Sequence, residues 1–279
     1  MSMVGGRRSK VVNVVRYVVL VVLALFFLLP FYVIVRNAFS TNQSIIAAQW
    51  QWIPQEWDFS VISRMFADQN LDLAGALVNS AVTAVLQTLA TVVISLLAGY
   101  ALARLKNWVG KLFMVLTVLT LMVPMAVVFL PMFVMTANFG WIDTYRGLII
   151  PIMFSAFATF MFHTAFVNFP AELEEAALID GANPFTTFWK VVVPNCSGII
   201  GAVGAITFIG AWNAFLWPLL VTRGSTTTVQ LALSRFMTSQ GVRYPELFAG
   251  GLVAIVPVVI VFLVLQRYLV QGVETSGIK

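Results

Sequence analysis

The stretch EEAALIDGANPFTTFWKVVVP, residues 174–194, is a polar segment between two strongly apolar runs, and it decides the fold. Its leading acidic residues suit a helix N-terminus, two alanines continue the helix, and Gly181 supplies a left-handed stop. Asn183 and Pro184 are typical of the N-cap and first position of a second helix. The pattern predicts two short helices that either lie on lipid headgroups or dock against a partner.

The rest of the chain is too apolar for a soluble domain. Its 279 residues are 60% hydrophobic and 10% charged, whereas soluble domains have roughly 45–50% and 25%. A water-facing surface needs more charge than this sequence supplies, so most of the surface must face lipid. The sequence therefore predicts a membrane protein.

Six long uncharged runs each have room for a helix of about 20 residues, which crosses a hydrocarbon layer of about 30 Å. The alternation typical of barrel strands is absent, so we expect an all-α membrane protein. The expected spans are 17–35, 79–103, 112–135, 147–167, 198–221 and 247–266. The remaining segments are 1–16, a loop 36–78, the polar loop 168–197, a loop 222–246 and a tail 271–279.

Basic residues orient the spans, because short cytoplasmic loops retain Lys and Arg. Most of them fall on the side of 1–16 and 168–197, so both termini are expected in the cytoplasm and the loops 36–78 and 222–246 outside. A signal peptide is the alternative for the first run. We favour a retained anchor because no small-residue cleavage site follows before Arg36.

The sequence lacks the residues needed for a zinc site, for nucleophilic catalysis and for a phosphate-binding loop. Cys196 is the only cysteine and His163 the only histidine, which leaves too few ligands for a typical zinc site and no nucleophile–base pair. The one Gly-Lys pair, Gly110-Lys111, lacks the upstream glycine and following hydroxyl of a phosphate-binding loop. We therefore expect no bound cofactor or metal, no enzymatic activity and no ATP hydrolysis by this chain.

The polar loop resembles the cytoplasmic signature loop of permease subunits of binding-protein-dependent ABC importers. That loop has an acid and two alanines, a glycine at a fixed interval, and later two aliphatic residues around any residue, followed by proline. The matching residues are Glu175, Ala176, Ala177, Gly181, Val191, Val193 and Pro194. The resemblance implies the type I (MetI-like) permease fold over 79–270 and contact with an ATPase. The residues expected in that contact are Glu174, Glu175, Ala176, Ala177, Asp180, Gly181 and Pro194.

Longer stretches, including GAWNAFLWPLL and the terminal QRYLVQGVETSGIK, are similar to the carbohydrate-uptake branch and its second maltose-type permease subunit. This similarity implies a sugar or sugar-like solute and a bacterial or archaeal cell membrane. The implied partners are a second permease subunit, two ATPase subunits that use ATP and Mg, and an extracytoplasmic solute-binding protein.

A path for a neutral sugar calls for aromatic and amide groups in the spans, and Trp212, Asn213 and Trp217 offer them. The competing interpretation is that Trp217 anchors at the membrane interface and Asn213 bonds a neighbouring helix. The competing function is a stand-alone secondary transporter or channel. Such proteins usually carry ionisable residues within their spans, and the expected spans have no Asp, Glu, Lys or Arg.

Overall fold

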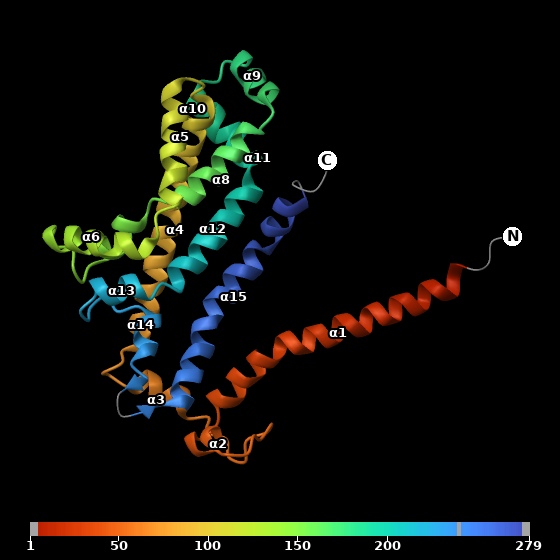
Figure 1. Cartoon of the computed structure of the whole chain (residues 1–279), viewed down its shortest axis with the longest axis vertical. Coiled ribbons are helices and arrows are strands. Elements are labelled where there is room, and N and C mark those ends of the chain that lie inside the picture. Colours follow the sequence, from red (N-terminus) through yellow and green to blue (C-terminus); the bar gives the residue numbers. More distant parts are fainter. Residues whose placement is uncertain (1–4, 239–240, 275–279) are drawn as a thin grey trace. The chain divides into compact units, whose positions relative to one another are not determined.

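The computed structural model describes residues 5–238 and 241–274, and these residues divide into two compact units. One unit runs to Leu71 and includes Leu233–Val253, and the other comprises Asp72–Ala232 and the chain from Ala254 onward. Nearly all regular structure is helical (Figure 1), which confirms the predicted class. A small antiparallel pair, β1 (Met237–Thr238) and β2 (Gly241–Val242), is the exception among the described residues.

The first unit contains α1 (Gly5–Ala38), α2 (Asn42–Ile46), α3 (Val61–Ala67) and the start of α15 (Tyr244–Glu274). Between Tyr17 and Val35, α1 has no charged residue and is apolar on all sides, and its most apolar window is not buried within the chain at all. A helix of this kind needs lipid or another protein around it. The last turn of α1, by contrast, is buried within the chain, and there the Arg36 side chain donates to Asn37 Oδ1 at 2.8 Å.

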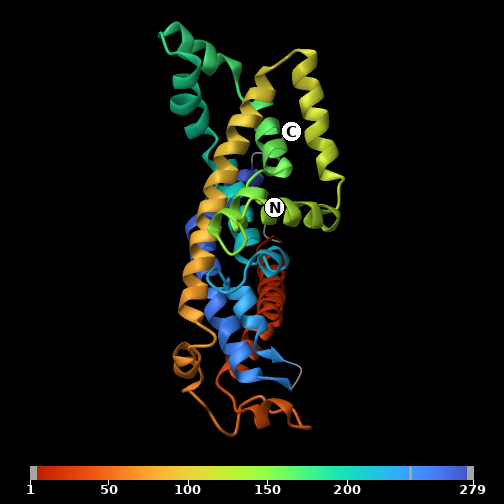
Figure 2. The same ribbon diagram turned by 90° about the vertical axis from the view of Figure 1, so that its left-hand side faces the viewer.

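The second unit is built on α4 (Leu73–Arg104), which packs along α8 (Ala156–Val167) and α12 (Ser197–Trp212) (Figures 1 and 2). At Gly99, α4 lies close against α8. A Cβ atom there would lie 2.9 Å from both the backbone nitrogen of His163 and the Cβ of Phe162. Apolar side chains fill the space around this contact: Leu96, Ala158, Phe162, Phe166, Phe188, Val192, Cys196 and Val203.

The run 112–135, expected as one span, is divided in the structure. Helix α5 (Trp108–Leu121) ends before Pro124, and α6 (Met125–Asn138) leaves at 101° to it (Figure 2). Proline disfavours helical geometry in the preceding residue and cannot donate a backbone hydrogen bond. Pro124, whose place inside the apolar run is compatible with either a kink or a fixed hinge, therefore lies at a break between two separate helices.

The run 147–167 is also divided, into α7 (Tyr145–Ile149), the 3₁₀ turn η1 (Ile150–Ile152) and α8, with a bend of 47°. The break exposes carbonyl groups that α4 satisfies. Thr91 Oγ1 donates to the carbonyl of Met153 at 2.8 Å, and Ser95 Oγ donates to that of Ser155 at 3.4 Å. Neighbouring Ser and Thr hydroxyls are the usual partners of freed carbonyls inside membrane helices.

The last two expected spans also differ in their limits. The run 198–221 comprises α12 and a short α13 (Leu216–Val221), and α14 (Val229–Ser234) follows in the loop. The last expected span, 247–266, lies within the longer helix α15 (Tyr244–Glu274), whose stretch apolar enough to cross a membrane is Tyr244–Gln266.

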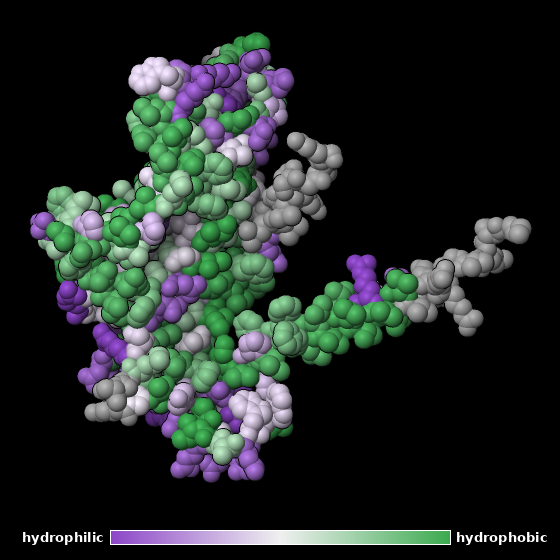
Figure 3. Space-filling model, in the orientation of Figure 1, coloured by the Kyte–Doolittle hydropathy of each residue, from purple (hydrophilic) through white to green (hydrophobic). Residues whose placement is uncertain are grey.

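Within the described residues, three helical stretches are long and apolar enough to cross a membrane: Val12–Ala38, Leu73–Arg104 and Tyr244–Gln266. The number rises to as many as six if each of three bent helix pairs forms one span. Exposed Leu, Val and Phe side chains cover the long helices, whereas hydrophilic residues gather at the end of the second unit that carries residues 171–187 (Figure 3).

Candidate functional site

The candidate site is the helix pair that interrupts the apolar chain after α8. Helix α9 (Ala171–Ile179) starts after Pro170, and α10 (Pro184–Thr187) starts after Asn183, whose side chain accepts from the backbone N–H of Thr186 at 2.8 Å. Gly181 lies between the helices with φ +84°, a conformation that favours glycine. The predicted helix, glycine stop and second helix are therefore all present.

A cluster of polar side chains fixes α9 to the end of α4. Glu174 accepts hydrogen bonds from Tyr100 Oη at 2.9 Å and from Arg104 Nε at 3.0 Å, and it forms an ion pair with Arg104 Nη2. Arg104 also donates to the carbonyl of Phe166 at 3.0 Å, so one guanidinium joins α4, the end of α8 and α9. We call Tyr100, Arg104 and Glu174 the anchor.

The anchor is shielded from solvent, and this affects its charge. Only 13% of the Glu174 side chain is exposed. Burial raises the pKa of Glu174, but hydrogen bonds from Arg104 and Tyr100 outweigh that effect and hold the pKa below its ordinary value. Charge-assisted bonds of this kind are stronger than neutral ones. The carboxylate therefore stays ionised and bound at neutral pH.

Aromatic packing holds the second helix at the same place. Phe188 begins a π-helical turn, η2 (Phe188–Val192), that continues α10 into α11 (Val193–Asn195). Its buried ring lies with its centroid 4.7 Å from that of Tyr100 and 6.2 Å from that of Phe166. Both helices of the pair are thus attached to α4 and α8, one by charge and one by apolar contact.

The opposite face of the pair is open. Helix α9 has no fully buried residue, Ile179 is 86% exposed and Phe185 is 69% exposed. Nothing lies within 4 Å of the position a Cβ would take at Gly181. The pair therefore presents small, apolar and acidic groups outward, as a docking surface would.

The structure separates the predicted contact residues into two groups. Glu174 faces inward to Arg104, and Ala177 is half-buried. The remaining predicted residues are exposed: Glu175, Ala176, Asp180, Gly181 and Pro194. Sequence reasoning missed Tyr100, Arg104 and Phe188 as part of the site. Arg104 is visible in the sequence only as a basic residue at the end of a long apolar run, which does not identify its partner.

The residues expected along a solute path are not gathered into one group. Trp212 and Trp217 are buried, and their indole nitrogens donate to the carbonyls of Ala254 at 3.0 Å and Gly147 at 3.1 Å. Asn213 is exposed at the end of α12 and accepts from Gln230 Nε2 at 3.1 Å. The two tryptophans thus pack inside the chain, and Trp217 does not lie at an exposed interface, whereas Asn213 bonds a neighbouring helix.

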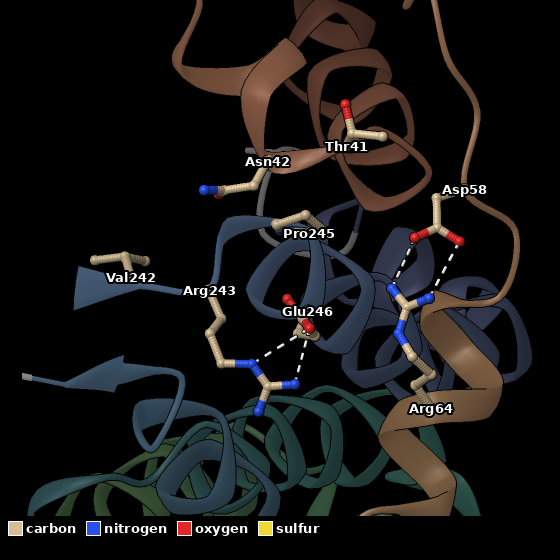
Figure 4. A pocket seen from close by; sticks show the side chains of 8 residues that line it. All are labelled: Thr41, Asn42, Asp58, Arg64, Val242, Arg243, Pro245 and Glu246. Carbon is tan, nitrogen blue, oxygen red and sulfur yellow. Dashed lines mark hydrogen bonds and ion pairs between the residues drawn. The ribbon is translucent and has the colours of Figure 1, made fainter. Parts of the chain in front are cut away.

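A second polar feature is a pocket of about 330 Å³ in the first unit (Figure 4). Its charges are paired with each other. Arg64 Nη2 lies 2.7 Å from Asp58 Oδ2, and Arg243 Nη2 lies 2.8 Å from Glu246 Oε1. The Arg64 hydrogen bonds lower the pKa of Asp58 to about 2. Since each acid has its own arginine, the pocket does not offer a free charge to a ligand.

No group of three or more His, Cys, Asp or Glu side chains placed to hold a metal ion occurs in the part of the chain that the structure describes. What the second unit does offer is an anchored helix pair with an open face, next to a cluster of buried apolar side chains.

Comparison with known proteins identifies the family of this chain. The sequence profile of the family described as "Binding-protein-dependent transport system inner membrane component" matches residues 91–275. The chain belongs to this family. The match includes the whole anchored helix pair and confirms the resemblance seen in the polar loop.

The relatives of this permease include proteins that match nearly its whole length. It is 32% identical to the sn-glycerol-3-phosphate transport system permease protein UgpE of Yersinia pestis, over 98% of this chain and 99% of that protein. It is 34% identical to the arabinooligosaccharides transport system permease protein AraQ of Bacillus subtilis, over 72% of each chain. The lactose transport system permease protein LacG of Rhizobium radiobacter is 30% identical, over 96% of this chain and 97% of that protein.

A solved structure supports the permease fold independently. The chain matches one from a bacterial ABC transporter involved in the import of the acidic polysaccharide alginate, with a TM-score of 0.79 and 22% identity. The match covers 96% of this permease and 100% of that chain. The predicted type I importer fold is therefore confirmed, and a multi-pass membrane location follows from the family and the apolar helices.

Proposed function

We propose that this permease couples ATP hydrolysis in partner subunits to passage of a sugar or sugar-like solute that an extracytoplasmic binding protein delivers. The observation that carries the proposal is the Arg104–Glu174 contact, which fixes the open helix pair to the longest helix of the second unit. The helix pair has an exposed outer face and an inner face bound to α4, so a displacement of the pair can be transmitted to α4. The ATPase would dock on the exposed face formed by Glu175, Ala176, Asp180 and Gly181.

The same contacts supply a route for the motion. A displacement of α9 reaches α4 through Glu174, and it reaches the end of α8 through the Arg104 bond to the Phe166 carbonyl. Close packing at Gly99 makes α4 and α8 move together, since packed helices are not freely deformable. We infer that α4 and α8 respond to the ATPase as one body.

The solute class rests on the relatives and on charge. Two of the named relatives transport carbohydrates and one transports sn-glycerol-3-phosphate. The predicted spans lack formal charges, which favours a neutral sugar over a phosphorylated solute, because a buried phosphate needs cationic partners. Asn213 is the strongest candidate for solute contact, since its amide is exposed at the break between α12 and α13.

The partners follow from the same proposal. A second permease subunit would complete the path, two ATPase subunits would bind ATP and Mg, and a solute-binding protein would act outside the bacterial or archaeal cell membrane. The missing phosphate-binding loop in this chain is the sequence feature that requires a separate ATPase.

Uptake in cells with and without this gene tests the proposal. The panel contains labelled lactose, an arabino-oligosaccharide and sn-glycerol-3-phosphate, with the membrane potential collapsed in one arm and ATP depleted in another. We expect uptake of at least one neutral sugar to need both the gene and ATP. Uptake that follows the membrane potential and survives ATP depletion would support a stand-alone transporter instead.

A further inference from the structure

The turn between α6 and α7 contains an acidic residue that organises a distant loop. The carboxylate of Asp143 accepts hydrogen bonds from the backbone N–H groups of Arg223, Ser225 and Thr226 at 3.0, 3.1 and 3.1 Å. It also accepts from the hydroxyls of Ser225 and Thr226 at 2.9 and 2.8 Å. The backbone N–H of Asp143 donates to the carbonyl of Val221 at 2.7 Å. One residue thus binds the segment that leaves α13 at several points.

The other side of that segment is held by α4. Asn79 Nδ2 donates to the carbonyls of Ser225 and Thr227 at 3.1 and 3.0 Å, and Asn79 Oδ1 accepts from Tyr145 Oη at 2.5 Å. Ser80 Oγ accepts from the backbone N–H of Val229 at 2.7 Å. We call these four side chains the loop clamp: Asn79, Ser80, Asp143 and Tyr145.

The geometry of Asp143 is one that a protein keeps only when its surroundings require it. Its φ is +57°, in the left-handed region that non-glycine residues seldom occupy. Burial raises the pKa of Asp143, but hydrogen bonds from the loop outweigh this and hold the pKa well below its ordinary range. Because the loop N–H groups converge on this carboxylate, they are already occupied, and the feature is not an anion-binding site.

The clamp fixes a segment that nonetheless exposes its tip. Thr226, Thr227 and Thr228 are buried, whereas Arg223 and Ser225 are exposed. An exposed tip held rigidly by polar contacts loses little further freedom when a partner binds it. This segment opens the loop 222–246, which the predicted orientation places outside the cell.

We propose that Asp143 is a positioning residue, which holds residues 222–229 in the conformation that engages the solute-binding protein, while Asn79 and Ser80 bind the same segment to α4. The inference rests on the proposed function, because it requires a binding protein as partner. Asp143 itself acts through the segment that it holds.

The test uses the complete complex in right-side-out vesicles, with Asp143→Asn as the main variant. Asparagine keeps the size and tolerates the left-handed conformation, but it replaces one acceptor oxygen with a donor that faces N–H groups. Asp58→Asn is the matched control, because it removes an outer acid that pairs only within the first unit. The readouts are trypsin cleavage after Arg223, transport against binding-protein concentration, and permease level in the membrane.

We expect cleavage after Arg223 to accelerate about tenfold in Asp143→Asn, since several charge-assisted hydrogen bonds are lost. The half-saturating binding-protein concentration should rise by a similar factor, with the maximal rate and membrane level little changed. Asp58→Asn should leave both quantities near the wild-type values.

Three results would each overturn the inference. Unchanged cleavage after Arg223 would show that Asp143 does not hold the segment, whatever the transporter does. Faster cleavage with an unchanged half-saturating concentration, or a loss confined to the membrane level, would show a structural role without positioning for the binding protein. Absence of transport in the wild type with every binding protein tried would refute the proposed function, while the cleavage result would still judge the clamp.

Discussion

Arg104 at the end of α4 and Glu174 on α9 form a shielded ion pair between residues 70 positions apart in the sequence. This contact joins a small surface helix to the main helix of the second unit. It gives the helix pair a defined attachment to α4.

Glu174→Gln should weaken coupling while leaving the permease in the membrane. The amide still accepts a hydrogen bond, but the charge that Arg104 faces is gone, and hydrogen bonds to charged groups are worth about 1.5–3 kcal/mol. We expect ATP-driven uptake to fall about tenfold, measured in vesicles at matched permease level. Glu175→Gln is the matched control for local structure, because Glu175 is exposed and outside the anchor. ATP hydrolysis in the Glu174→Gln complex should fall less than uptake, and equal loss of both would count against a coupling role.

The charge of Glu174 also predicts a pH response. Its pKa in the folded protein lies below the ordinary value of 4.5, so the pair stabilises the fold above that value and loses its contribution as the pH falls through the folded pKa. The difference in thermal unfolding midpoint between wild type and Glu174→Gln should therefore stay constant from about pH 5 to pH 8. A difference that disappears on going from pH 8 to pH 6 would contradict the assignment.

Gly181→Ala should strain the turn between α9 and α10. The added methyl meets no neighbour, so the cost comes from φ +84° alone and is about 1 kcal/mol. Gly210→Ala is the matched control, because Gly210 also has open space around it but lies in helical geometry in α12. We expect a lower ratio of solute moved to ATP hydrolysed in Gly181→Ala only. An equal ratio of solute moved to ATP hydrolysed in the two variants would show that the turn at Gly181 does not contribute to coupling.

Gly99→Ala should loosen the bundle that the anchor drives. Its Cβ would lie 2.9 Å from Phe162 Cβ and from the His163 backbone nitrogen, so α4 and α8 must separate. Overpacking of this kind costs about 1–3 kcal/mol, measured as a lower unfolding midpoint in detergent. Gly251→Ala, with nothing within 4 Å, should leave the midpoint unchanged. If the midpoint is retained in Gly99→Ala, the close contact does not limit stability.

The sequence predicted the helix pair well because its signals are local. Asn183 and Gly181 act on their neighbours in the chain, so their roles could be seen without a structure. The partners of Glu174 could not, since nothing in a sequence shows that α9 folds back on Arg104. Glu174 is therefore predicted, together with Glu175, to contact the ATPase, whereas in the structure its side chain faces Arg104.

The spans also show that sequence signals are local and do not reveal how distant segments are arranged. Hydropathy located the apolar runs, but it does not record the direction of a helix after an interruption. Pro124 turns the chain by 101° within one run, and the break before α8 is stabilised by Thr91 and Ser95 on another helix. The tryptophans expected in the solute path pack inside the chain, because their N–H groups find carbonyls that composition cannot reveal.

A variant pair separates packing from solute contact near that path. Trp217→Phe should lower the unfolding midpoint, by roughly 1 kcal/mol for the lost hydrogen bond, without changing the half-saturating solute concentration. Asn213→Ala should raise that concentration with little effect on the midpoint, because its amide is exposed. If Trp217→Phe instead raises the half-saturating solute concentration and Asn213→Ala lowers the unfolding midpoint, Trp217 contacts the solute and Asn213 has a structural role.

The most direct test of the central claim is the number of solute molecules moved per ATP in the reconstituted complex, measured for four forms of the anchor. These are the wild type, Glu174→Arg, Arg104→Glu and the double variant with exchanged charges. The account predicts that each single variant lowers the ratio, because like charges then meet between α4 and α9, and that the double variant restores a large part of it. Single variants with wild-type ratios, or a double variant no better than either single one, would contradict coupling through the Arg104–Glu174 contact.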